Sequence, residues 1–176
     1  QSKPAIFDTA KLEWMNGQYL SALTAAELLP DVTRELTAMG VATGGRDLRP
    51  IIDAGKARSW LITDVASQAA VRVDPATAVR DAKGEQLVTK MGPAFTGNPT
   101  LAADVLGAVS AADWVAEKLA EPLKALAEAK GLKLGDVMQP IRVALTGSTV
   151  SEPVNELLAV VGRDAALAQI ARTAGI

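Results

Sequence analysis

The residues of this chain that could do chemistry lie around a break between two expected helices. Arg142 stands near the end of a segment, residues 134–145, whose apolar side chains recur at helical spacing. Gly147 can end that helix in a left-handed turn, and Ser151 has the side chain of a helix N-cap, with Pro153 in the first turn that follows. A guanidinium beside a helix N-terminus could bind a phosphate or hydrogen bond to a nucleic-acid base.

A structural interpretation of the same residues is also open. The aliphatic part of Arg142 can lie along the apolar face of its helix while the guanidinium pairs with Asp136 or Glu152. Exposed arginines in soluble proteins commonly form such weak pairs. Judged from the residues alone, the structural interpretation is the one we favour.

The composition excludes several classes of chemistry. The 176 residues contain no histidine and no cysteine. Histidine-dependent acid–base catalysis, Ser–His nucleophiles, histidine-ligated metals, disulfides and thiol chemistry are therefore excluded. The chain also lacks the GxxxxGK[ST] and GxGxxG phosphate-binding patterns. We expect no catalytic residue and no metal site here.

The composition favours a helical protein without an overall basic surface. Hydrophobic residues make up 49% of the chain but aromatic residues only 3%, so alanine, leucine and valine must form the core. Such small aliphatic residues are typical of closely packed helices. The net charge of −2 predicts that any contact with nucleic acid uses local basic groups rather than a basic surface.

The termini and apolar runs predict the cellular location. No apolar run reaches the roughly 20 residues that span a membrane, and no signal peptide opens the chain. We expect a cytoplasmic protein without membrane contact. Because Gln1 stands where a methionine would begin a native chain, we expect an internal cut or a tag remnant there.

Capping and stop signals predict an all-α fold, a helical bundle in two packed subdomains, residues 1–73 and 74–176. In the first we expect an extended lead-in over residues 1–6 and a short helix from Asp8 that stops at Asn16–Gly17. A capping box then opens a helix that ends near Gly40, and further helices begin near residues 47 and 57.

In the second subdomain, residues 76–95 predict one helix broken near Gly84 or two short ones. Residues 96–99 have the composition of a loop, followed by a short helix over 100–109. Ser110 is expected to cap a long helix that ends at Lys130, with Trp114 in the core. After the helix over 134–145, a last helix begins at Arg163.

Two segments of the chain resemble bacterial glutamyl-tRNA synthetases. The run GLKLGDVMQPIRVALTGSTVSEPVNELLAVVGRD is similar to the end of those enzymes, whose C-terminal helical region binds the anticodon. The run PAIFDTAKLEWMNGQYL is similar to the segment where that region begins. The resemblance implies the anticodon-binding α-helix cage of these class I synthetases, with the similarity weakest between residues 40 and 99.

The resemblance also implies which residues recognise the anticodon. The positions that match are Arg142, Ser151 and Val154 around the break, together with Arg58 and Lys124. Arg58 matches the family arginine that checks the third anticodon base, at the start of a helix, although Arg46, Arg49 and Lys56 compete for that role. The chain departs from the family at Glu152, where relatives can carry proline, and at Pro153, where they can carry glycine.

The implied function is recognition of the anticodon loop of a glutamate tRNA, as the C-terminal part of a glutamate–tRNA ligase. ATP and magnesium would be used by a catalytic domain whose signatures this chain lacks, so we expect the fragment alone to be an inactive monomer. Two alternatives stay open: a helical protein-interaction scaffold, and a regulatory module that kept the fold and lost tRNA binding.

Overall fold

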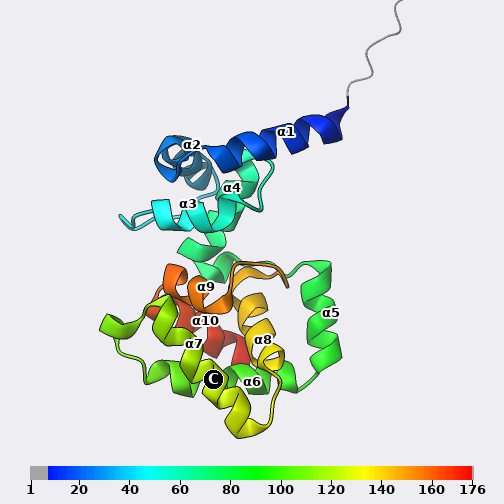
Figure 1. Cartoon of the computed structure of the whole chain (residues 1–176), viewed down its shortest axis with the longest axis vertical. Coiled ribbons are helices and arrows are strands. Elements are labelled where there is room, and N and C mark those ends of the chain that lie inside the picture. The colour runs from blue at the N-terminus through cyan, green and yellow to red at the C-terminus, as the bar shows by residue number, and fades with distance from the viewer. Residues whose placement is uncertain (1–7, 176) are drawn as a thin grey trace, which may run out of the picture. The chain divides into compact units, whose positions relative to one another are not determined.

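Figure 1 shows the fold of the chain, a computed structural model that describes residues 8–175. Every regular element in that range is helical, with ten α-helices and two short 3-10 helices. The expected all-α fold is confirmed. The expected extended lead-in over residues 1–6 lies outside the described residues.

The elements follow one another with short connections. The order is α1 (Thr9–Ala22), α2 (Ala25–Ala38), α3 (Arg49–Lys56), α4 (Ile62–Val73), η1 (Pro75–Thr77), α5 (Ala82–Met91), α6 (Ala94–Gly107), η2 (Ala111–Asp113), α7 (Ala116–Lys130), α8 (Leu134–Thr146), α9 (Val154–Val161) and α10 (Arg163–Ala174). Two compact units divide between Ala69 and Ala70, inside α4, slightly before the boundary expected after residue 73.

The first unit is organised by two well-capped helices. Asp8 caps α1 by accepting a hydrogen bond from the Lys11 amide, at 3.1 Å. Thr24 and Glu27 form the predicted capping box of α2. The buried face of α2 carries leucine and valine at helical spacing and packs against α3; its members are Leu28, Val32 and Leu36.

The expectation that α1 stops at Asn16–Gly17 is wrong, because α1 continues to Ala22. The Asn16 side chain donates a hydrogen bond to the backbone carbonyl of Trp60. Gly17 faces the same segment closely, since a Cβ on it would lie 3.3 Å from Trp60 Cδ1. The two residues that suggested a helix end therefore make a contact with a distant part of the same unit.

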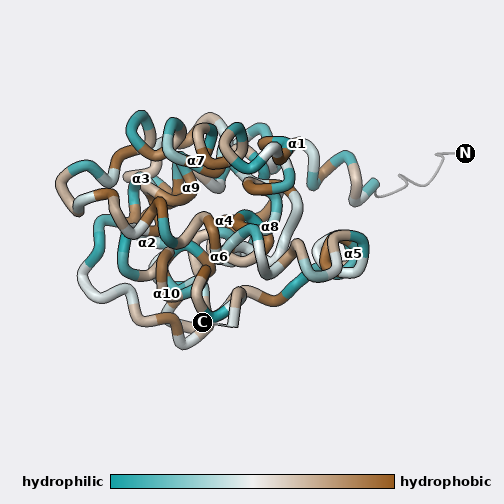
Figure 2. The backbone as a smooth tube through the Cα atoms, turned by 90° about the horizontal axis from the view of Figure 1, so that it is seen from below, coloured by the Kyte–Doolittle hydropathy of each residue, from teal (hydrophilic) through white to brown (hydrophobic). Residues whose placement is uncertain are grey.

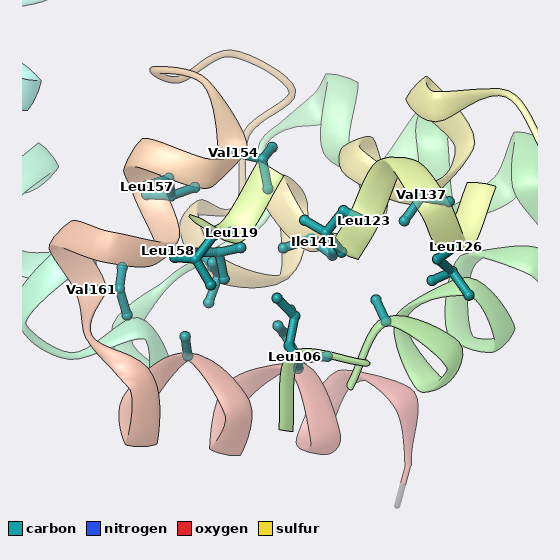
Figure 3. Packing of buried hydrophobic residues seen from close by; sticks show 14 of the residues in the cluster. Leu106, Leu119, Leu123, Leu126, Val137, Ile141, Val154, Leu157, Leu158 and Val161 are labelled. Carbon is teal, nitrogen blue, oxygen red and sulfur yellow. The ribbon is translucent and has the colours of Figure 1, made fainter. Parts of the chain in front are cut away.

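The second unit closes around one hydrophobic core. Helices α6 to α10 contribute leucine, isoleucine and valine side chains that interdigitate in Figure 3. Along α7 the tube in Figure 2 changes repeatedly between hydrophobic and hydrophilic residues, as expected of a helix with one apolar face. Trp114 lies in this core as expected, and its indole N–H donates to the Leu158 carbonyl at 2.8 Å.

Residues 96–99, expected as a loop, lie inside α6. The buried residues of α6 recur at helical spacing: Phe95, Asn98, Pro99, Ala102 and Leu106. The Asn98 side chain also donates to the Asp136 carbonyl at 2.8 Å. Burial of this face outweighs the loop propensity of a Gly-Asn-Pro sequence.

The helix expected from Ser110 to Lys130 is divided. Ser110 caps only the 3-10 helix η2, where its hydroxyl accepts from the Asp113 amide, and α7 begins at Ala116. Val115, which precedes α7, has an extended backbone and an exposed side chain. Within residues 76–95 the regular elements are η1, α5 and the start of α6. No helix among the described residues has the length and apolar content to cross a membrane.

Candidate functional site

The candidate site lies where α8 ends and the chain turns toward α9. Gly147 ends α8 as predicted, with φ at 74° in the left-handed region that favours glycine. The hydroxyl of Thr146 donates to the Arg142 carbonyl at 2.8 Å, and accepts from the Ser148 amide at 3.2 Å. These bonds fix the direction in which the chain leaves α8.

The connection from Ser148 to Pro153, called here the α8–α9 loop, is held by hydrogen bonds from Arg142 of α8 and by a hydrogen bond within the loop itself. Arg142 Nε donates to Ser151 Oγ at 2.9 Å, and Arg142 Nη1 reaches the Thr149 carbonyl at 3.5 Å. The Ser151 hydroxyl in turn donates to the Glu152 carbonyl at 2.7 Å. The sequence placed Arg142 and Ser151 in one site, and the structure brings their side chains into direct contact.

Ser151 has a different role from the expected one. Helix α9 begins at Val154 with Pro153 as its N-cap residue and without a side-chain capping bond. A serine hydroxyl caps a helix only when it is at the residue that precedes the first turn. Ser151 lies before that position, and its hydroxyl links Arg142 to the loop backbone.

A buried ion pair anchors the α8–α9 loop. Arg72, on α4, donates from Nε to Glu152 Oε1 at 2.8 Å, and its Nη2 binds the second carboxylate oxygen. The two side chains are 0% and 4% exposed, and the residues lie 80 positions apart in the chain. Burying two charges is costly unless they are paired in this bidentate way, so the contact specifies where Glu152 lies.

The buried pair also bears on the departure from the family pattern at residue 152. An exposed carboxylate beside Ser151 would repel the phosphates of an RNA ligand. Here the charge of Glu152 is neutralised by Arg72 and lies below the surface. The α8–α9 loop therefore carries a glutamate without presenting a negative charge to a ligand.

The other two candidates in the second unit differ in accessibility. Val154 is 3% exposed and packs in the core against α7 and α8, as Figure 3 shows. Its side chain presents almost no surface to a ligand. Lys124 is exposed on α7. A single exposed lysine supplies a mobile point charge, which suits a phosphate better than a base edge.

Arg58 belongs to the first unit, and the helix expected to start beside it begins later. Residues 57–61 connect α3 to α4, which starts at Ile62. Asp64 explains the later start, since its carboxylate accepts from the amides of Trp60 and Leu61 at 3.1 and 2.9 Å. Arg58 is exposed and donates to the Ala54 carbonyl at 2.7 Å, one turn back in α3.

The three competitors of Arg58 are engaged in different ways. Arg49 pairs with Asp47, and this contact lowers the pKa of that carboxyl to about 2. Lys56 pairs with Asp53 and donates to the Leu23 carbonyl at 2.7 Å. Burial lowers the pKa of Arg46 from its ordinary value. Arg49 and Arg58 are thus the exposed arginines of this group, whereas Arg46 is half-buried.

Two structural features of the site were not predictable from the sequence pattern. Arg72 stands between Val71 and Val73 in an unremarkable helical segment, and only its burial identifies it. The backbone of residues 78–81 lies against Gly147, with the Asp81 amide donating to the Gly147 carbonyl at 2.9 Å. In the described part of the chain no acidic cluster could hold a metal ion. The site offers a guanidinium and a hydroxyl, both half-buried, that can hydrogen bond to a ligand.

A family model described as "Anticodon binding domain" matches residues 25–174. The match includes the whole α8–α9 loop, Arg58 and Lys124. Arg72 and segment 78–81 also lie within it.

Curated glutamate–tRNA ligases are similar to the chain over nearly all of its length. The ligase 2 of Rhodospirillum rubrum is 34% identical over 95% of the chain, and the ligase of Azorhizobium caulinodans is 33% identical over 94%. The chain covers 36% of each of these relatives, so it spans about a third of their length.

Solved structures of such ligases share the fold. A glutamate tRNA ligase from Elizabethkingia meningosepticum, crystallised with its amino acid, superposes with a TM-score of 0.79 at 25% identity, over 96% of this chain and 32% of that one. A glutamate–tRNA synthetase from Elizabethkingia anophelis gives 0.74 at 26% identity, over 97% of this chain and 32% of that one.

Proposed function

The chain belongs to the anticodon binding domain family, and from that membership we propose that it binds the anticodon loop of a glutamate tRNA as part of a glutamate–tRNA ligase. The observation that carries the proposal is the contact between Arg142 Nε and Ser151 Oγ, at 2.9 Å, inside the region that the family model matches. The choice of a glutamate tRNA is supported by the similarity to glutamate–tRNA ligases in sequence and in solved structure.

The geometry of the α8–α9 loop suits recognition of an RNA loop. Specific RNA-binding proteins hydrogen bond to unstacked bases in loops, and an anticodon is such a loop. Donors that are already held in place lose little entropy on binding. The hydrogen bonds of Arg142 to the loop and the anchoring of Glu152 by Arg72 provide this order before RNA arrives.

The division of labour in the parent enzyme is part of the same proposal. A catalytic domain would bind ATP and magnesium and attach glutamate to the tRNA in the cytoplasm. The chain would contribute affinity and selectivity by holding the anticodon. Arg58 would favour cytosine over guanine at the third anticodon base, because a guanidinium can donate to the N3 and O2 acceptors on the Watson–Crick edge of cytosine, where guanine presents N–H donors. This preference would select glutamate over glutamine tRNA.

Replacement of Arg142 by alanine tests the proposal directly. If Arg142 binds an anticodon base, the Arg142→Ala chain should lose about 1–3 kcal/mol of tRNA binding free energy. The loss should largely disappear for a tRNA already altered at that base. Arg34→Ala is the matched control, since Arg34 is an exposed arginine of α2 paired with Asp31 at 2.8 Å. Affinities are measured at several salt concentrations, with a thermal melt of each variant.

The remaining outcomes separate the alternatives. Equal weakening toward all tRNAs, with a salt dependence reduced by about one counterion, would mean a phosphate contact. A lower melting temperature with unchanged tRNA affinity would mean a structural arginine. Absence of tRNA binding by the unaltered chain would favour a protein-interaction or regulatory module.

A further inference from the structure

The backbone of residues 78–81, called here segment 78–81, lies in direct contact with the turn that begins the α8–α9 loop. A Cβ on Gly147 would lie 2.0 Å from the Val79 carbonyl oxygen and 3.1 Å from the Arg80 nitrogen. The Asp81 amide donates to the Gly147 carbonyl at 2.9 Å. Only glycine allows two backbones this close, so segment 78–81 and the turn form one surface.

Helix α5 fixes the other end of this segment. The Asp81 carboxylate accepts from the Gly84 amide at 2.7 Å and caps α5. That bond, with a further one to the Ser148 side chain, holds the pKa of Asp81 below its ordinary value. Gly84 also touches the turn, since a Cβ there would lie 2.5 Å from the Gly147 carbonyl. Figure 1 shows α5 beside α8, to which these contacts attach it.

Segment 78–81 presents one apolar and one cationic side chain beside the loop. Val79 is 85% exposed, and Val150 in the α8–α9 loop is 59% exposed; among the described residues of the second unit these are the most exposed large hydrophobic side chains. Arg80 is partly exposed, 3.5 Å from Glu85 and 5.9 Å above the Phe95 ring. One exposed valine is ordinary, but two that flank a turn next to exposed basic side chains form a mixed apolar and cationic surface.

We propose that segment 78–81 is a second wall of the RNA site, on which Val79 contacts a base or ribose and Arg80 binds a phosphate of the same anticodon loop. The inference rests on the proposed function. It adds residues outside the α8–α9 loop that follow from the contact with Gly147 and from continuity with that loop. Apolar contact with a base face and a charged bond to a phosphate are two of the interactions that single-stranded RNA offers in addition to its base edges.

The experiment measures binding of glutamate tRNA to the unaltered chain and to two variants, Val79→Ser and Arg80→Gln. Arg80→Gln should weaken binding about tenfold at low salt, and should reduce the salt dependence by about one counterion. Val79→Ser should weaken binding about three- to tenfold with no change in salt dependence. Both losses should persist for tRNAs altered at the anticodon bases.

Lys130→Ala serves as the control. Lys130 is an exposed basic residue at the end of α7, near the start of α8, whereas the candidate site lies at the end of α8. This variant should bind tRNA like the unaltered chain. Thermal melts of all variants should coincide, since the replaced side chains are exposed.

The inference is overturned if Val79→Ser and Arg80→Gln bind like the unaltered chain while Arg142→Ala loses affinity. That result would leave the proposed function intact. If the unaltered chain binds no tRNA, the proposed function fails first, and the inference fails with it. Weakened binding in the Lys130 control as large as in Arg80→Gln would also overturn it, because the effect would then be one of general charge.

Discussion

The α8–α9 loop and the turn that carries Arg58 were both singled out by a resemblance, but they are held in different ways. In the loop, Glu152 is tied to Arg72 through a buried pair, and Gly147 is pressed against segment 78–81. In the turn, Arg58 bonds to Ala54, and Asp64 caps the following helix. The turn also receives a longer-range bond, from the Asn16 side chain to the Trp60 carbonyl.

The two regions are therefore held in one conformation by different kinds of contact. Local bonds are formed whenever the short segment is helical, whereas the loop requires the whole second unit to be folded. We therefore expect alterations of the buried contacts that hold the loop to change both stability and RNA binding. Alterations at Arg58 should affect binding alone.

The largest expected effect is on the buried pair. Arg72→Ala leaves the Glu152 carboxylate buried and unpaired, which should lower the free energy of unfolding by about 3–5 kcal/mol. The measurement is urea denaturation followed by the fluorescence of Trp114, in a background where Trp14 and Trp60 are replaced by phenylalanine. The double variant Arg72→Met, Glu152→Leu should recover most of the loss, and a single variant within 1 kcal/mol of the unaltered chain would contradict the assignment.

A smaller loss is expected from Gly147→Ala. The new Cβ meets both an unfavourable φ and the Val79 carbonyl, so unfolding free energy should fall by about 3 kcal/mol. Gly131→Ala is the matched control, with φ at 63° and no atom within 4 Å of the added Cβ. It should lose only about 1 kcal/mol. Equal losses of unfolding free energy in the two variants would show that segment 78–81 moves away from the added Cβ without destabilising the fold.

Arg58→Ala should change selectivity and leave stability within about 0.5 kcal/mol. Binding of glutamate tRNA should weaken by about 1–3 kcal/mol, with no loss for a tRNA altered at the third anticodon base. Competition between glutamate and glutamine tRNAs measures the preference. If Arg49→Ala or Lys56→Ala abolishes the preference and Arg58→Ala does not, the role passes to that neighbour.

The smallest effect concerns acid stability through Asp81. Because its pKa is lower in the folded chain than its ordinary value of 3.8, the carboxylate stabilises the fold above that pH, and the contribution is lost as pH falls through the folded pKa. Asp81→Ala should remove the cap at neutral pH, at about 1 kcal/mol, and should flatten this acid dependence. Denaturation between pH 2 and pH 7 compares the two chains. A parallel pH dependence would assign the acid loss to other carboxyls.

The local features of the fold were predictable because their causes are local. The capping box of Thr24 and Glu27, the end of α8 at Gly147 and the buried face of α2 each depend on residues a few positions apart. The same logic failed at Asn16–Gly17 and at residues 96–99. There, contacts with Trp60 and Asp136 decide the structure, and these partners lie far away in the chain.

In the candidate site too, the features set by neighbouring residues were predictable and those set by distant contacts were not. The neighbourhood of Arg142 and Ser151 followed from a helix, a break and a second helix, but the exact helix start did not, because the residues before α9 are bound to Arg142 instead of capping. Val154 shows the limit of a prediction from family spacing, since the residue at the matching position is buried in the core. Arg72 could not be found, because nothing in a helical arginine indicates a partner 80 residues away.

The buried pair constrains how this sequence could have changed over time. A lineage that carries proline at position 152 and then acquires glutamate places a buried charge in the core unless an arginine already stands at position 72. If the arginine at position 72 is acquired first, its guanidinium is buried without a carboxylate partner. Either order passes through a destabilised intermediate, so the two substitutions should be inherited together. Among homologues, the identity of residue 152 should therefore be predictable from residue 72, although one lies in a loop and the other in helix α4.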